Sequence, residues 1–300
     1  MCTAILDLAP GAPVLLAGVR DELVDRAWEP PGRYWPDHPG LTGGRDLQAG
    51  GTWLAVAPQA RRVTCVLNAR GRPAEPGSRR TRGVLPLEVA EDAKLSRAGL
   101  ADFDPFHVLS AEPGLAMLWS WDGEHLTERE LGPGLHMLVN SGLASDLLRP
   151  NAGSEGAGNA GREHELARLR HFRPRLTAAA RPDPHPGAPV AQAWGAWLPL
   201  IDGDGLGPDD PRALIVRRDL GDGRIWGTTS VSLVAVWPDA MRYDFTAAPG
   251  NRDAWYNVIA LSVPRRSVAG LATPQPRRRS ERSHAGHPEF RSPPAGQRAT

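Results

Sequence analysis

The sequence has few of the residues that mark secreted, membrane or nucleic-acid-binding proteins. It contains two cysteines, Cys2 and Cys65, whereas a secreted domain stapled by disulfides carries more of them in a shorter chain. Lys94 is the single lysine, and a net charge of +1 excludes a strong general attraction to nucleic acid. No apolar run approaches the roughly 18 residues of a membrane span, and no basic segment precedes an apolar stretch at the N-terminus. We therefore expect a cytoplasmic protein with no nucleic-acid partner and no membrane span.

The composition predicts one large folded domain followed by a tail. Of the 300 residues, 41% are hydrophobic, which is enough to bury a sizeable core. Residues 265–300 differ, because they hold eight Arg, two Glu and almost no large apolar residues. Such a composition cannot offset the entropy lost on ordering. We predict a single domain over residues 1–264 and a disordered Arg/Pro-rich tail over 265–300. The abundance of Ala, Gly, Pro and Arg is typical of bacterial coding bias.

Short apolar runs bounded by turn residues predict antiparallel strands. Residues 2–8 and 13–18 predict a hairpin that places Cys2 beside residues 18–22. Residues 28–48 are rich in Pro, Gly and aromatic residues, which predicts an ordered loop. Further strands are expected at 51–57, 61–67, 105–110, 114–121, 124–130, 212–218, 229–237, 240–247 and 254–262, and helices at 85–98, 162–178 and 190–201. Since strands and helices do not alternate regularly, the order indicates an α+β fold with two stacked antiparallel sheets and helices outside them.

Cys2 is the residue with the clearest chemical meaning. Removal of Met1 would leave a chain that begins with a free amine and a thiol on one residue. The α-amino group titrates near pH 7.7 to 8.0 and a free thiol near 8.5, so the amine is able to accept the thiol proton. One residue would then supply both a nucleophile and its base. The alternative is that Cys2 is merely a small residue tolerated at this position.

Several motifs follow Cys2 in an order that resembles a known family. Residues 17–22 read Ala-Gly-Val-Arg-Asp-Glu, residues 50–54 read Gly-Gly-Thr-Trp-Leu, and Asn68 ends the next strand. Together with the Met-Cys start, this order resembles the NRDE-motif family, also called the Transport and Golgi organisation protein two family. Arg82-Gly83, the stretch from Gly134 to Asn140 and residues 226–232 resemble later parts of the same family.

The resemblance implies both a fold and a set of roles. The fold is the four-layered αββα sandwich of N-terminal-nucleophile hydrolases, a group that includes bile-salt and penicillin-V amidases. By that analogy, Cys2 attacks an amide carbonyl, Asp21 anchors the amine and Arg20 lines the pocket. Asn68 and Asn140 are the expected hydrogen-bond donors to the oxyanion. The implied reaction is hydrolysis of a small or lipid-like amide, with no metal and no cofactor.

Two departures from the family pattern keep a second reading open. Val19 stands where the motif has its first Asn, and Thr229 stands where the family keeps an Arg, whose charge a threonine cannot supply. The alternative is a non-catalytic protein on the same fold that binds or carries a hydrophobic ligand, either a lipid or haem. No Cys-x-x-Cys-His haem-attachment motif is present. The oligomeric state does not follow from the sequence.

Overall fold

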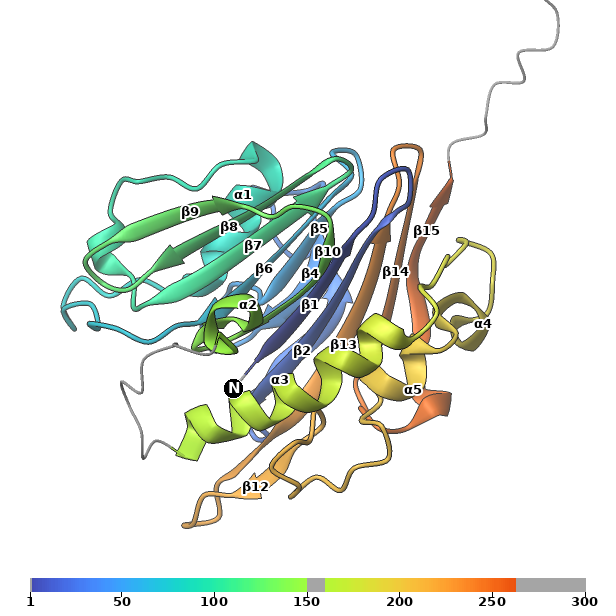
Figure 1. Ribbon diagram of the computed structural model, residues 1–300. Helices are drawn as coiled ribbons and strands as arrows, with labels where there is room; N and C mark the ends of the chain where they lie inside the picture. Colours follow the sequence, from blue (N-terminus) through green and yellow to red (C-terminus); the bar gives the residue numbers. More distant parts are fainter. Residues whose placement is uncertain (1, 150–159, 263–300) are drawn as a thin grey trace, which may run out of the picture. The chain divides into compact units, whose positions relative to one another are not determined.

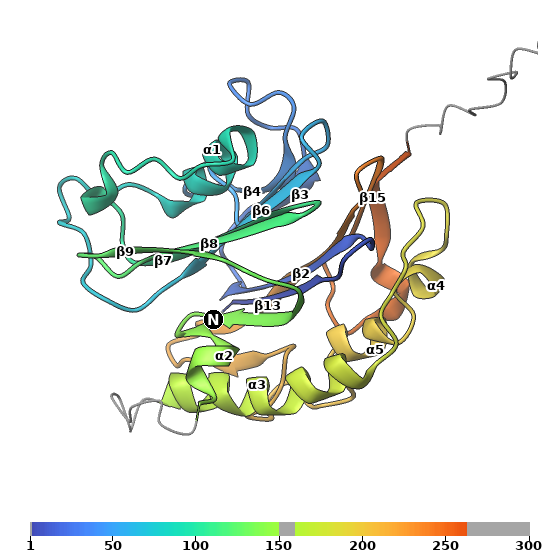
Figure 2. The ribbon, with the colours of Figure 1, turned by 45° about the horizontal axis from the view of Figure 1, so that its top comes forward.

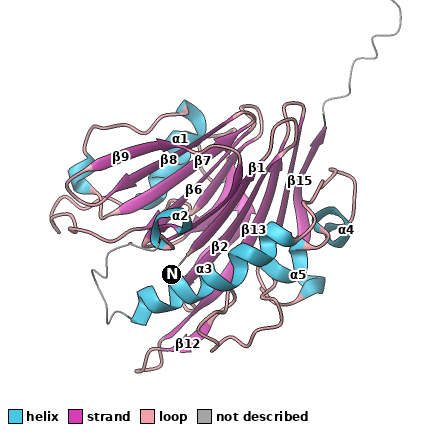
Figure 3. Ribbon diagram, viewed as in Figure 1, coloured by secondary structure: helices cyan, strands magenta, loops and turns pink. Residues whose placement is uncertain are grey.

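The computed structural model describes residues 2–149 and 160–262, and the predicted tail of residues 265–300 lies outside them. These residues belong to one compact unit that comprises residues 1–263. Two antiparallel sheets make up most of it, and the helices lie outside the sheets (Figures 1 and 3). None of the described helices is long and apolar enough to cross a membrane.

The first sheet holds both ends of the described chain. In spatial order its strands are β11 (Gly142–Leu143), β10 (Gly134–Val139), β1 (Thr3–Leu8), β2 (Val14–Leu23), β13 (Ile225–Val236), β14 (Ala240–Thr246) and β15 (Tyr256–Ser262), and β12 (Arg217–Asp219) pairs with β13 at one end. The strands that flank β1 and β2 thus come from distant parts of the sequence.

The second sheet follows the chain order without crossovers. Its strands are β3 (Trp28–Gly32), β4 (Thr42–Asp46), β5 (Leu54–Ala57), β6 (Arg62–Asn68), β7 (Phe106–Glu112), β8 (Leu115–Trp121) and β9 (Leu126–Glu130). Strands β3 and β4 correct the predicted loop over residues 28–48. Pro30 and Pro31 concealed strand β3, but the register between β3 and β4 shifts there, and an irregular edge strand accommodates proline.

The helices cover the outer faces of the two sheets. Helix α1 (Leu85–Asp92) packs on the second sheet, and α3 (Ala160–Ala178), α4 (Val190–Trp194) and α5 (Trp197–Ile201) pack on the first, as Figure 2 shows. A short helix, α2 (Ala144–Leu147), follows β11, and the single-turn 3-10 helices are η1 (Arg82–Val84), η2 (Leu100–Asp102) and η3 (Arg252–Ala254). The predicted four-layered αββα sandwich with two antiparallel sheets is confirmed.

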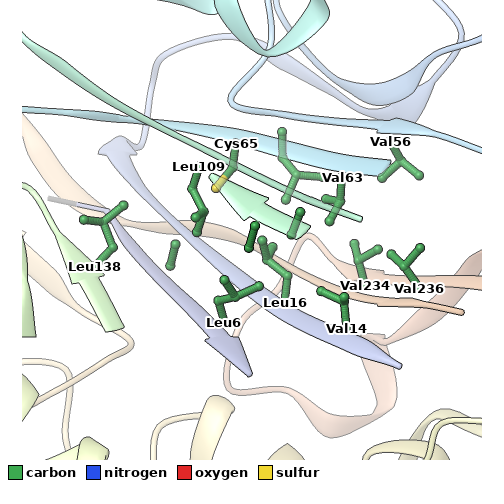
Figure 4. Packing of buried hydrophobic residues seen from close by; sticks show 14 of the residues in the cluster. Leu6, Val14, Leu16, Val56, Val63, Cys65, Leu109, Leu138, Val234 and Val236 are labelled. Carbon is green, nitrogen blue, oxygen red and sulfur yellow. The ribbon is translucent and has the colours of Figure 1, made fainter. Parts of the chain in front are cut away.

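Alternation along the central strands explains why their sequences are apolar throughout. On β1, Leu6 faces the second sheet and Ile5 faces the helices, since neighbouring side chains of a strand point to opposite faces. On β2, Leu16 and Leu15 divide in the same way. Figure 4 shows residues of both sheets meeting in the layer between them. Both faces of the first sheet are therefore buried, which leaves the strand ends as the place for polar chemistry.

Candidate active site

Cys2 lies where the ends of three strands meet. Thr3, the first residue of β1, pairs with Val19 on β2 and with Val139 on β10. The backbone N–H of Cys2 donates a hydrogen bond of 3.0 Å to Oδ1 of Asn140, just after β10. The Cys2 thiol lies 3.8 Å from the backbone carbonyl of Asp21. The predicted hairpin that brings Cys2 beside residues 18–22 is confirmed.

Arg20 and Asp21 are neighbours on β2, so their side chains point to opposite faces of the sheet. Strand β13 has a register shift between Thr228 and Ser230, where Asp21 pairs with Thr228 and Arg20 pairs with Ser230. The extra residue of this bulge is Thr229. Thr228 consequently reaches Asp21 on one face, while Thr229 reaches Arg20 on the other.

The Asp21 carboxylate is buried on the helix side of the sheet. Its Oδ1 accepts a hydrogen bond of 2.7 Å from the Thr228 hydroxyl, and its Oδ2 lies 3.3 Å from Nη1 of Arg168. Arg168 projects from α3, is 1% exposed, and also donates to the Thr3 hydroxyl at 2.7 Å and to the backbone carbonyl of Ala213 at 2.9 Å. Helix α3 thus holds both β1 and β2 from behind Cys2.

The Arg20 guanidinium is buried on the opposite face, toward the second sheet. It donates 2.8 Å to the Thr229 hydroxyl, lies 3.5 Å from the Asp46 carboxylate and stacks 4.4 Å from the ring of Trp53. Burial lowers the pKa of Arg20, against the opposing charges of Glu22, Cys2 and Asp46. Thr229 therefore orients an arginine that the motif provides, although it adds no charge of its own.

Asp46 connects two arginines beside Cys2. Nε of Arg26 donates to it at 2.6 Å, and the backbone N–H groups of Gln48 and Ala49 donate at 3.0 and 2.9 Å. Burial raises the pKa of the Asp46 carboxyl, but the hydrogen bonds from Arg26 and the backbone outweigh it and lower the pKa overall. Asp46 stays ionised and compensates the charges of Arg20 and Arg26.

The two asparagines occupy different places. Asn68, at the end of β6, is exposed and lines the same cleft as Cys2, Arg20 and Asp21. Asn140 is absent from the lining of this cleft but contacts the Cys2 backbone, as described above. Its own carbonyl accepts a hydrogen bond of 3.3 Å from Nε2 of His107. The side chain of Asn140 is thus placed beside the nitrogen that would become the free amine.

The cleft has a volume of about 700 Å³, and many of its lining residues are charged. Five arginines line it, namely Arg20, Arg26, Arg79, Arg80 and Arg82, together with four acidic residues, Asp21, Glu22, Asp46 and Asp104. No histidine occurs among the described lining residues, so Cys2 is the one side chain there that commonly ligates haem iron. A charged lining of this kind does not fit an apolar macrocycle, which prefers hydrophobic and aromatic walls.

The electrostatics of Cys2 favour the neutral thiol. Burial raises its pKa, and the negative charge of Asp21 acts in the same direction, while the positive charge of the amino terminus, the contact with the Asp21 backbone and the charge of Arg20 oppose them. The other cysteine, Cys65, is fully enclosed in the layer between the sheets, and burial raises its pKa to about 12. The Cys2 thiol therefore needs a base at neutral pH, and Cys65 is chemically inert there.

The position of Val19 shows what its departure from the family motif changes. Its side chain is 2% exposed and packs with the apolar cluster between the first sheet and the helices. The replacement of Asn by Val at this position therefore removes no polar group from the cleft, which lies on the other face.

Sequence reasoning missed three residues that contribute to the site. Asp46 fell in a segment predicted as a loop, and Arg168 is far from the motif in sequence. Arg82 was noted as part of an Arg-Gly pair, without a role. The Gly-Gly-Thr-Trp motif could have indicated that a segment such as the one with Arg82 lies beside it, because its glycines imply a close approach of another backbone segment.

A family model for Transport and Golgi organisation 2 matches residues 1–168, more than half of the chain. The chain belongs to the Transport and Golgi organisation 2 family. The match spans Cys2, the Arg-Asp-Glu segment and both asparagines, and it ends at Arg168. The resemblance seen in the motifs is therefore confirmed.

Two further comparisons add little about activity. No curated protein sequence matches the chain. Among solved structures, it is similar to a Caenorhabditis elegans N-acylethanolamine-hydrolyzing acid amidase ortholog, with 11% sequence identity and a TM-score of 0.40 over 84% of this chain and 95% of that one. A likeness at this level says nothing about the reaction of the present family member.

Proposed function

We propose that this family member is a cysteine amidohydrolase in which Cys2, freed by removal of Met1, is both nucleophile and base. The observation that carries the proposal is the hydrogen bond from the Cys2 backbone nitrogen to Asn140, combined with the position of Cys2 at the wall of a polar cleft. Asn140 would hold the amine in place, while the thiol on the same residue meets the substrate.

The proposed reaction proceeds through a thioester. The Cys2 amine takes the thiol proton as sulfur attacks the amide carbon, and the C–N bond then breaks as the amine returns that proton to the leaving nitrogen. Water, deprotonated by the same amine, next hydrolyses the thioester and restores the thiol. Since the proton moves during attack, a thiol whose pKa is raised by burial is compatible with this chemistry.

Two asparagines are the candidates to stabilise the oxyanion. Asn68 is exposed at the cleft, and its side-chain amide is available to a substrate oxygen. Asn140 uses its Oδ1 to accept from Cys2, which leaves Nδ2 as a donor. A donor of this kind contributes about 3 to 4 kcal/mol to catalysis in well-studied enzymes.

The charged cleft favours a small polar amide over a lipid-like one. A hydrophobic-ligand carrier remains the alternative, but the lining described above gives it less support. Haem titration tests the haem version of this alternative, because a carrier of haem would shift the haem absorbance spectrum, whereas an unchanged spectrum would argue against it.

The decisive experiment is the intact mass of the purified protein before and after brief treatment with a thiol electrophile, followed by peptide mapping. We expect a mass without Met1 and a label on Cys2. The Cys65→Ala variant is the matched control and should label equally, because Cys65 is enclosed and its pKa is about 12. Retention of Met1, or an inert Cys2, would overturn the proposal.

A further inference from the structure

The cleft holds one arginine that differs from the others in its partners. Arg20 and Arg26 share Asp46, Arg79 lies 3.2 Å from Asp104, and Arg80 lies 3.6 Å from Glu88. By contrast, Arg82 forms no ion pair with any carboxylate among the described residues. Its hydrogen bond is from Nη1 to the backbone carbonyl of Pro105, at 2.9 Å.

Arg82 is partly buried, so its charge is costly to leave without a partner. Burial lowers the pKa of its guanidinium, with the negative charges of Asp104 and of an ionised Cys2 acting against that effect. Arg82 and Cys2 line the same cleft. An anion that entered the cleft would supply a charge to pair with the guanidinium.

The backbone around Arg82 is locked in place. The Thr81 hydroxyl accepts from the Gly83 N–H at 3.2 Å, and the Thr52 N–H donates 2.8 Å to the Gly83 carbonyl. Gly51 packs so closely that a Cβ there would lie 2.4 Å from the Gly83 carbonyl carbon. The segment 81–83 is thus fixed against the Gly-Gly-Thr-Trp motif, and the arginine is held ready before a ligand arrives.

The free donors of Arg82 have a geometry that selects the anion. With Nη1 engaged by Pro105, no acceptor for Nε or Nη2 is found among the residues that the structure describes. These two groups form one planar edge of the guanidinium, which fits the two oxygens of a carboxylate. A phosphate site would normally gather several cations and backbone N–H groups, whereas the neighbouring arginines already have acid partners.

We propose that Arg82 recognises a carboxylate on the substrate, so that the substrate class is a small amide bearing a carboxylate, such as an N-acyl amino acid. This inference rests on the proposed function in so far as the bound molecule is called a substrate. Recognition of the carboxylate itself requires only the cleft. It identifies Arg82 as the residue that determines specificity, separate from the reacting groups at Cys2.

The test compares two reagents of similar size at the same sulfur. Iodoacetate carries a carboxylate and iodoacetamide is neutral, so the ratio of their alkylation rates at Cys2 reports anion recognition and cancels any change in thiol pKa. We expect the ratio of the iodoacetate rate to the iodoacetamide rate to be higher at Cys2 of the wild-type protein than for free glutathione. The ratio should fall roughly five- to tenfold in Arg82→Gln, in keeping with the loss of a charge-assisted hydrogen bond, and less in Arg82→Lys.

Arg80→Gln is the matched control, because Arg80 lines the same cleft but is paired with Glu88 and stacks on Phe103. An equal fall in Arg80→Gln would attribute the preference to general positive potential and overturn the proposal. An unchanged ratio in Arg82→Gln would overturn it as well. The iodoacetamide rate alone shows whether each variant keeps a folded site.

A binding experiment separates this inference from the proposed function. Calorimetric titration with N-acetylglycine and with its neutral counterpart N-acetylglycinamide needs no reaction at Cys2. We expect tighter binding of N-acetylglycine by the wild-type protein and loss of that difference in Arg82→Gln, even if Cys2 proves inert. Equal affinity of the wild-type protein for both compounds would refute carboxylate recognition while leaving the nucleophile untouched.

Discussion

Replacing Arg168 with methionine removes the cation from its buried ion pair with Asp21, on the helix side of the strand beside Cys2. Arg168 is 1% exposed and Asp21 is 2% exposed, so water cannot replace the lost hydrogen bonds. Methionine keeps much of the apolar stem of Arg168. The Asp21 carboxylate, however, loses the guanidinium and retains only its other partners. Breaking a buried pair from one side typically costs about 3 to 5 kcal/mol, and we expect a loss of that size in the free energy of unfolding.

Urea unfolding followed by tryptophan fluorescence measures this loss. Arg170→Met is the matched control, because Arg170 lies two residues away on the same helix and is exposed, and it should change stability by no more than about 0.5 kcal/mol. The double variant Arg168→Met with Asp21→Asn should lose less than the sum of the two single variants, since neither charge is then stranded. A cost below about 1 kcal/mol for Arg168→Met would refute the reasoning.

Three other outcomes follow from the structure. Burial lowers the pKa of His107 to about 4, so the unfolded chain binds more protons than the folded one between pH 6.5 and 4. The free energy of unfolding should therefore fall by up to about 3 kcal/mol as the pH drops through that range. Urea unfolding at pH 7 and pH 4.5 checks this, and an equal loss of stability between these pH values in His107→Gln would contradict it. Because burial raises the pKa of Cys2, its alkylation rate should still be rising at pH 9, and a plateau near pH 7 would argue against a buried thiol. Gly51→Ala should be destabilising and should reduce the iodoacetate preference, because its Cβ would collide with the backbone of Gly83, whereas Gly77→Ala has open space and should have little effect on either.

The layers of this fold could be predicted from the sequence, because the spacing of apolar residues indicates which strands are buried. The hairpin of β1 and β2 follows from two apolar runs and a Pro-Gly turn, and this hairpin alone predicts that Cys2 lies beside Arg20 and Asp21. Strand β10 was seen as a family-like stretch but was not predicted as a strand. Its sequence, Gly-Leu-His-Met-Leu-Val, gives no clear alternation, since both faces of the first sheet are covered.

The remaining parts of the site depend on contacts between distant segments. Asp46 and Trp53 approach Arg20 from the second sheet, and Arg168 approaches Asp21 from α3. No local pattern encodes which arginine pairs with which carboxylate, because many combinations share the same composition. That Arg82 has no acid partner within residues 2–149 and 160–262 is likewise a property of the packed cleft, and it could not be read from the sequence.

The order of strands in the first sheet also has a consequence for synthesis. Strand β1 leaves the ribosome first, yet its two neighbours are β2 and β10, and β2 in turn needs β13, more than 200 residues later. At roughly 5 to 20 residues per second, that interval lasts on the order of ten seconds or longer. The N-terminal residues lack Asn140 for the first part of that interval and lack Thr228 until its end. Exposure of Cys2 to aminopeptidases would therefore come first, and assembly of the reactive site would come last.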